Sequence, residues 1–127
     1  NTNPLRGVPA TGYLVEFRDK RWLFPGDTRT YDASQLPSFG LVDGLFAPLW
    51  LGRGCAMLDG PPLLGPFCRF FSDLQPSRIV LTHLTEFGRA AEDYWDISHA
   101  QRAASHFQEH FSHIEISHAF MGQKVIL

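Results

Sequence analysis

Residues 22–29 read Trp-Leu-Phe-Pro-Gly-Asp-Thr-Arg, an apolar strand that runs into a glycine and then into an acidic residue. Gly26 has no Cβ, so the backbone can turn sharply there and place the carboxylate of Asp27 in a crevice. Residues 78–84, Arg-Ile-Val-Leu-Thr-His-Leu, follow the same plan, with His83 at the end of the apolar run. Open α/β sheets bind their ligands at the carboxyl ends of strands. The two stretches therefore predict that Asp27 and His83 converge on one metal site.

The other elements follow from hydrophobic periodicity and from turn residues. Residues 12–17 and 21–24 predict a β-hairpin around a polar turn. Residues 51–66 are rich in glycine and proline, which is typical of a loop. The remaining predicted elements are strands at 41–50, 79–82, 113–117 and 124–127 and helices at 67–74 and 97–111. This order predicts an α/β fold, a mixed sheet with helices on one face, in a single domain over residues 1–127.

Composition and charge narrow the classes of function. The chain has 127 residues and a formal net charge of −2, which argues against nucleic acid as its main partner. No apolar run approaches the roughly 20 residues of a membrane span. The polar amino end is unlike a signal peptide, although a chain that begins at Asn1 leaves room for a missing amino-terminal portion. Cys55 and Cys68 lack C-x-x-C spacing, which favours two buried thiols and a cytoplasmic location.

A carboxylate and a neutral imidazole together suit Zn²⁺ or a similar divalent ion. Around Asp27 and His83 the sequence resembles the carboxyl-terminal half of the metallo-β-lactamase superfamily. The segments that carry this resemblance are residues 12–15, 24–29, 43–50 and 79–84. In that family a strand ending in Gly-Asp-Thr presents a carboxylate that commonly bridges two metals, and a later strand ending in Thr-His-Leu presents the last histidine ligand. The resemblance implies half of an αβ/βα sandwich, with Asp27 and His83 as ligands of one or two zinc ions.

The chain departs from the family in its first half. The H-x-H-x-D-H signature is missing, and no histidine precedes His83. A catalytic zinc site takes about three protein ligands and an open position for water. The resemblance therefore implies a partial metal-dependent hydrolase, inactive alone, whose missing ligands lie on an amino-terminal half. In the complete site, the metal would activate water against a small-molecule substrate.

Several neighbours of the predicted ligands have side chains that could steady them or contact a substrate. These residues are Thr28, Arg29, Trp50, Glu86, Arg89 and Asp93. A serine hydrolase is not favoured, because no G-x-S-x-G elbow is present.

The last third of the chain is rich in histidine: His99, His106, His110, His113 and His118. His106 and His110 have the i, i+4 spacing of the zincin motif, but the glutamate of H-E-x-x-H is in the wrong place. We interpret His106 and His110 as part of the solvent-facing side of a helix whose other side carries Phe107 and Phe111.

A second interpretation is a non-catalytic half-fold that binds a partner or oligomerises. The complete family fold packs two sheets face to face, so half of it would leave an apolar sheet face open. The residues available for that face are Tyr13, Val15, Phe17, Trp22, Phe24 and Phe46. We expect a complex with the amino-terminal half, or a homodimer, in preference to a free monomer.

Overall fold

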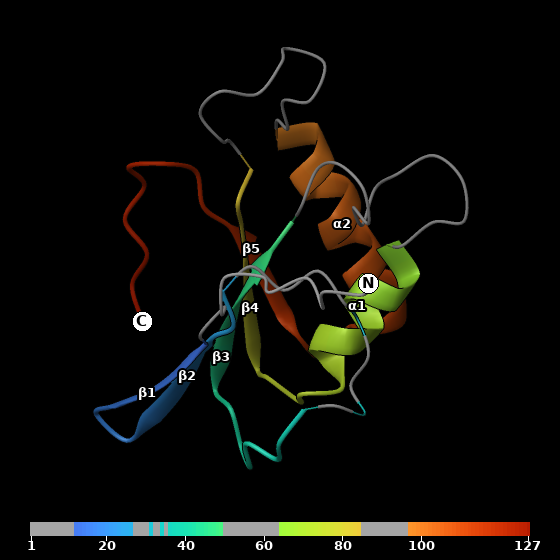
Figure 1. Cartoon of the computed structure of the whole chain (residues 1–127). Helices are drawn as coiled ribbons and strands as arrows, with labels where there is room; N and C mark the ends of the chain where they lie inside the picture. Colours follow the sequence, from blue (N-terminus) through green and yellow to red (C-terminus); the bar gives the residue numbers. More distant parts are fainter. Residues whose placement is uncertain (1–11, 27–30, 32–33, 35, 50–63, 85–96) are drawn as a thin grey trace, which may run out of the picture.

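A computed structural model describes residues 12–26, 31, 34, 36–49, 64–84 and 97–127. Its elements in chain order are β1 (Tyr13–Phe17), β2 (Lys20–Phe24), β3 (Gly44–Pro48), α1 (Leu64–Ser72), β4 (Arg78–Thr82), α2 (Ile97–His110) and β5 (Glu115–His118). The strands form one sheet in the order β1-β2-β3-β4-β5, and both helices lie on the same side of it (Figure 1). The prediction of an α/β fold with a mixed sheet is confirmed.

Strand direction is what positions the candidate site. β1 runs antiparallel to β2, whereas each neighbouring pair from β2 to β5 is parallel. Parallel neighbours need a crossover connection, which α1 supplies between β3 and β4 and α2 supplies between β4 and β5. The carboxyl ends of β2, β3, β4 and β5 therefore meet at one edge of the sheet.

The β1–β2 hairpin has the predicted place and a two-residue turn. Arg18 and Asp19 both have left-handed backbone, with φ of 49° and 63°. A turn with positive φ at both central residues matches the right-handed twist of the strands that it joins. The turn therefore fixes the register in which Phe17 pairs with Lys20 and Tyr13 pairs with Phe24.

Asp43 makes hydrogen bonds that connect the amino ends of the parallel strands. Its carboxylate accepts a hydrogen bond of 2.7 Å from the backbone N–H of Arg21, and its own N–H donates to the carbonyl of Arg21. Its carbonyl accepts hydrogen bonds from the N–H groups of Ser77 and Arg78. One residue thus joins β2 to the start of β4 and holds the strands in register, which also aligns their carboxyl ends.

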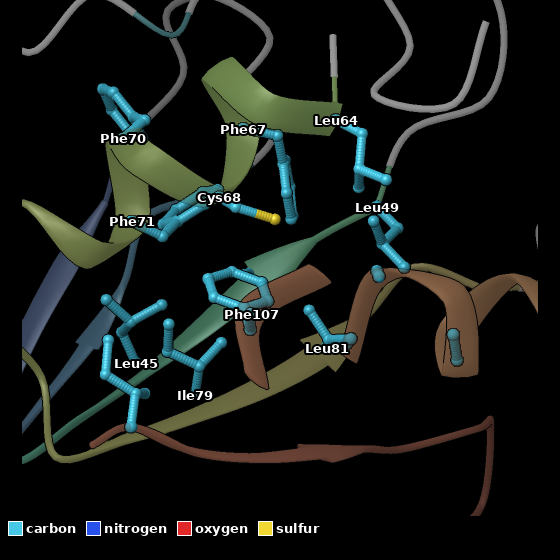
Figure 2. Close-up of a cluster of buried hydrophobic side chains, with 14 of the residues drawn as sticks. Leu45, Leu49, Leu64, Phe67, Cys68, Phe70, Phe71, Ile79, Leu81 and Phe107 are labelled. Atoms are coloured by element: carbon cyan, nitrogen blue, oxygen red, sulfur yellow. The ribbon is translucent and has the colours of Figure 1, made fainter. Parts of the chain in front are cut away.

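The core lies between the helices and the sheet (Figure 2). Alternate residues of the central strands point into it, because successive side chains of a strand face opposite sides. Aromatic rings dominate the helical side, where the centres of Phe67 and Phe71 lie 4.9 Å apart and Phe67 meets Phe107 edge to face. The largest wholly buried side chains here are Leu45, Leu49, Phe67, Phe71, Ile79, Leu81 and Phe107.

Cys68 belongs to this core as a free, buried thiol, as predicted; Cys55 lies outside the described residues. Burial raises the pKa of the Cys68 thiol to about 12. The thiolate is the reactive form, so native Cys68 should resist alkylation at about pH 8. In a Cys55→Ser variant, iodoacetamide followed by mass spectrometry should label Cys68 only after denaturation. Equal labelling rates with and without denaturant would contradict this burial.

The second face of the sheet, opposite the helices, carries the six apolar residues proposed for it. Tyr13 and Val15 pair directly with Phe24 and Trp22, so these four side chains share one face. Phe46 stacks on Phe24, with ring centres 4.7 Å apart. At the β1 end this face is open, since Tyr13 is 64% exposed, Val15 41% and Phe17 58%.

The carboxyl-terminal segment occupies the other end of the second face. The Arg78 guanidinium lies over the ring of Trp22 and donates a hydrogen bond of 2.7 Å to the carbonyl of Ile126. Figure 1 shows this segment on the side of the sheet away from the helices. Trp22 is consequently only 3% exposed, whereas the aromatic residues of β1 stay open.

Some predicted boundaries are wrong. Residues 124–127 form no strand: after a turn at Gly122 the chain crosses a sheet face and does not join an edge strand (Figure 1). The first helix begins at Leu64, within the predicted loop, and therefore includes Pro66. Proline is tolerated there, because the N–H groups of the first turn of a helix have no intrahelical hydrogen-bond partner. The strand predicted at 41–50 is confined to Gly44–Pro48.

Within the described residues, no helix is long and apolar enough to cross a membrane.

Candidate metal-binding site at the carboxyl edge of the sheet

A pocket of about 380 Å³ lies where β2, β3 and β4 end. Its walls come from the last residues of these strands and from those directly after them: Phe24, Pro25, Gly26, Phe46, Pro48, Thr82 and His83. This is the position at which parallel sheets place ligands. The pocket therefore contains one predicted ligand, His83, and the residue that immediately precedes the other, Asp27.

Gly26 turns the chain at the end of β2, as predicted. Its φ of 72° lies in the left-handed region, which glycine adopts without the penalty that a Cβ imposes. The turn lies at the pocket wall, so the chain changes direction beside the pocket immediately before Asp27. Asp27 itself lies outside the described residues.

His83 also has left-handed backbone, with φ of 64°. Such a conformation costs a non-glycine residue about 1–3 kcal/mol and persists only where the surrounding structure enforces it. Leu81, two residues before His83, and Leu84, directly after it, are buried in the core at 0% and 2% exposure. Their anchoring leaves the half-buried His83 at the pocket wall, between two fixed points of the chain.

Strand spacing sets the distance that the two ligands would have to span. β2 and β4 are separated only by β3, so their ends lie roughly 10 Å apart. A carboxylate and an imidazole that approach from such ends can share an ion with bonds of about 2.0–2.2 Å. In the described part of the pocket, His83 supplies a nitrogen of the kind that ligates zinc. Its remaining walls, Phe24, Phe46 and Pro48, are mainly apolar.

The backbone of His83 yields a stability prediction. Glycine tolerates left-handed φ and alanine does not, so His83→Gly should be about 1 kcal/mol more stable than His83→Ala. Urea denaturation of the two variants measures the difference. His113 provides the matched control, because it has no positive φ. There the glycine variant should be no more stable than the alanine variant, and a His83 pair that behaves in the same way would contradict the argument.

Of the residues predicted to ligate the metal or to surround its ligands, His83 alone lies within the described part of the chain. The others, Asp27, Thr28, Arg29, Trp50, Glu86, Arg89 and Asp93, fall outside it. Within the described residues, no group of three or more His, Cys, Asp or Glu side chains is positioned to hold a metal ion. The partial ligand set expected from the sequence therefore stays a prediction.

Sequence reasoning missed the aromatic wall of the pocket. Phe24 and Phe46 lie on neighbouring strands and stack with ring planes 14° apart. Their alternation within β2 and β3 places them on the face opposite the core, a pattern that could have identified them once the register was known. The stack joins the pocket to the second face of the sheet.

No protein-family model matches this chain, and no curated protein matches it.

Proposed function

We propose that this chain is the carboxyl-terminal half of a metal-dependent hydrolase with the metallo-β-lactamase fold. One observation supports it above the others: His83 and Gly26, the residue before Asp27, line the same pocket at the carboxyl edge of a parallel sheet. The resemblance of the Gly-Asp-Thr and Thr-His-Leu strand ends to the ligand positions of that superfamily supports the same assignment. In this proposal Asp27 and His83 hold a zinc ion.

The chemistry follows from the residues around those ligands. When bound, zinc supplies a Lewis acid that activates water and polarises the scissile bond of a small-molecule substrate. Asp27 supplies negative charge and His83 a neutral nitrogen, each held at the end of a strand. Thr28 and Arg29 would steady the carboxylate or contact an anionic substrate. Glu86, Arg89 and Asp93 would orient His83, and Trp50 would add a wall to the pocket.

Two ligands alone leave such a site incomplete, because catalytic zinc sites use about three protein ligands. The proposal assigns the missing ligands to an amino-terminal half of the fold. Its sheet would pack on the second face, where Tyr13, Val15 and Phe17 are exposed. Burial of apolar area would contribute about 25 cal/mol per Å² to that association.

Complementation tests this proposal. The amino-terminal half, produced as a separate polypeptide, should restore zinc-dependent hydrolysis when it is mixed with this chain. Asp27→Ala and His83→Ala should each abolish the restored activity, since each removes a ligand. Asp19→Asn and His113→Ala are matched controls, because these residues lie in the hairpin turn and after α2 and asparagine tolerates the left-handed backbone of residue 19; both variants should leave activity intact. A mixture that binds no more zinc than its two parts contradicts the proposal.

The open second face supports another candidate function, a non-catalytic module that oligomerises or binds a partner. Exposed aromatic and branched side chains in one row favour association. Sedimentation at low micromolar concentration should then show a dimer that Phe17→Asp converts to monomer. A wild-type chain that stays monomeric would argue against this candidate.

A further inference from the structure

A second pocket, of about 650 Å³, lies between the two helices. Among the described residues it shares no wall with the carboxyl-edge pocket. Its side chains differ in character from the apolar walls of that pocket, because both helices contribute charged or titratable groups. The principal ones are Arg69, Phe70 and Asp73 on the α1 side and His106, His110 and Phe111 on the α2 side.

The two histidines lie next to each other at this pocket. Their spacing of four residues places both imidazoles on one side of α2, and the ring centres are 4.5 Å apart with planes inclined at 45°. Two imidazoles that share one tetrahedral ion have ring centres roughly 5 Å apart, given metal–nitrogen bonds of about 2.0–2.1 Å. The separation of the two ring centres is therefore in the range that a shared ion requires.

His106 is not a purely solvent-facing residue, contrary to the interpretation from sequence. It is half-buried and lines the pocket together with Phe70 and Phe111. Burial lowers the pKa of His106, and the neighbouring His110 lowers it further, against an opposing effect of Glu109. A neutral imidazole has the free lone pair that a metal ligand requires.

Charged side chains of both signs surround the two rings. Glu109 lies 4.0 Å from Nε2 of His110, and the carboxylate of Asp73 lines the pocket from the α1 side. The other titratable side chains are Tyr31 and Arg69 at this pocket and Arg102 in the groove on the other side of His106. The two arginines and the two carboxylates are all exposed, so solvent screens both signs of charge, and the case for a metal ion depends on the two imidazoles.

We propose that His106 and His110 form a chelating site for a divalent transition ion, separate from Asp27 and His83. Solvent would complete the coordination sphere, with Asp73 on the opposite wall. Nitrogen donors of this kind prefer Cu²⁺, followed by Ni²⁺ and Zn²⁺, and they bind Mg²⁺ and Ca²⁺ poorly. The helix pair would thus present an open metal site on the outer side of the helical layer.

The test uses Ni²⁺ as the probe and a full chain that carries Asp27→Ala and His83→Ala, so that the carboxyl-edge ligands cannot contribute. Isothermal titration should show one site. His106→Gln or His110→Gln should weaken it by roughly tenfold or more, because each removes one of the two nitrogen ligands. His99→Gln and His113→Gln remove the same chemical group elsewhere and should leave the affinity unchanged.

His110→Gln keeps the test valid if replacement of the half-buried His106 disturbs folding, since the side chain of His110 is 57% exposed. Lowering the pH from about 7.5 to 5.5 should also weaken binding, because protons compete for both rings. Affinity that survives His110→Gln in a folded chain overturns the proposal. Equal losses in the His99 and His113 controls overturn it too, because they would indicate general binding to surface histidines.

Discussion

Replacement of Phe107 by alanine should destabilise the protein by about 3–5 kcal/mol, the cost of removing a large aromatic side chain from a closed core. Phe107 is 0% exposed and meets Phe67 edge to face, with ring centres 6.2 Å apart. It is also the principal aromatic contact of α2 with the ring cluster of α1 (Figure 2). Its removal should therefore loosen the helical layer against the sheet.

Phe17→Ala is the matched control, because the same ring is removed from a residue that is 58% exposed. Its effect should stay within about 0.5 kcal/mol. Urea denaturation followed by circular dichroism measures both variants. Similar midpoints for Phe107→Ala and the wild type would contradict the assignment of the core.

Gly44→Ala should produce the second large loss of stability, of about 1–3 kcal/mol. Gly44 is the direct partner of Trp22 across β2 and β3, and the indole ring lies over it. A Cβ at residue 44 would approach Trp22 Cζ3 to 2.5 Å, closer than real Cβ atoms come to a neighbouring atom. The indole cannot move aside easily, because Phe46 and the guanidinium of Arg78 pack against it.

The same substitution at Gly65 should have the opposite effect on stability. Gly65 lies in the first turn of α1, and a Cβ there would meet nothing within 4 Å. Alanine should stabilise the helix by about 0.5–1 kcal/mol, since glycine loses more backbone freedom on folding. A thermal melt of the pair should show Gly44→Ala below the wild type and Gly65→Ala above it. Equal shifts in one direction would contradict the packing at Gly44.

Local sequence pattern predicted most of the fold. The hairpin, the central strands and the helix from Ile97 were accessible because each has a clear period of alternation or a clear turn residue. The sheet face that carries Tyr13, Val15 and Phe17 was accessible for the same reason. In each case the information lies in neighbouring residues, without reference to distant parts of the chain.

Features that depend on distant contacts were not accessible. Lys124–Leu127 has strand composition, but the hydrogen bond from Arg78 to Ile126 fixes that segment on a sheet face. The stack of Phe24 on Phe46 and the closeness of Trp22 to Gly44 depend on the register between strands. No pattern within a single strand specifies that register.

In the candidate site too, some features follow from the local sequence and others do not. The strand end at Thr82 and the turn at Gly26 could be predicted from sequence, and the structure places Gly26 and His83 on one pocket. The left-handed backbone of His83 could not be predicted, because no local pattern marks a non-glycine residue for positive φ. The role of Asp27 stays a prediction.

Anomalous diffraction from crystals of this chain grown with zinc tests the central claim most directly, because it locates the ion itself. The account predicts a zinc peak in the pocket at the carboxyl edge, bonded at about 2.0–2.2 Å to both the Asp27 carboxylate and the His83 imidazole. A second peak at His106 and His110 would be compatible with this result. Side chains of Asp27 and His83 that lie beyond the reach of one ion, or on opposite sides of the sheet, would contradict it.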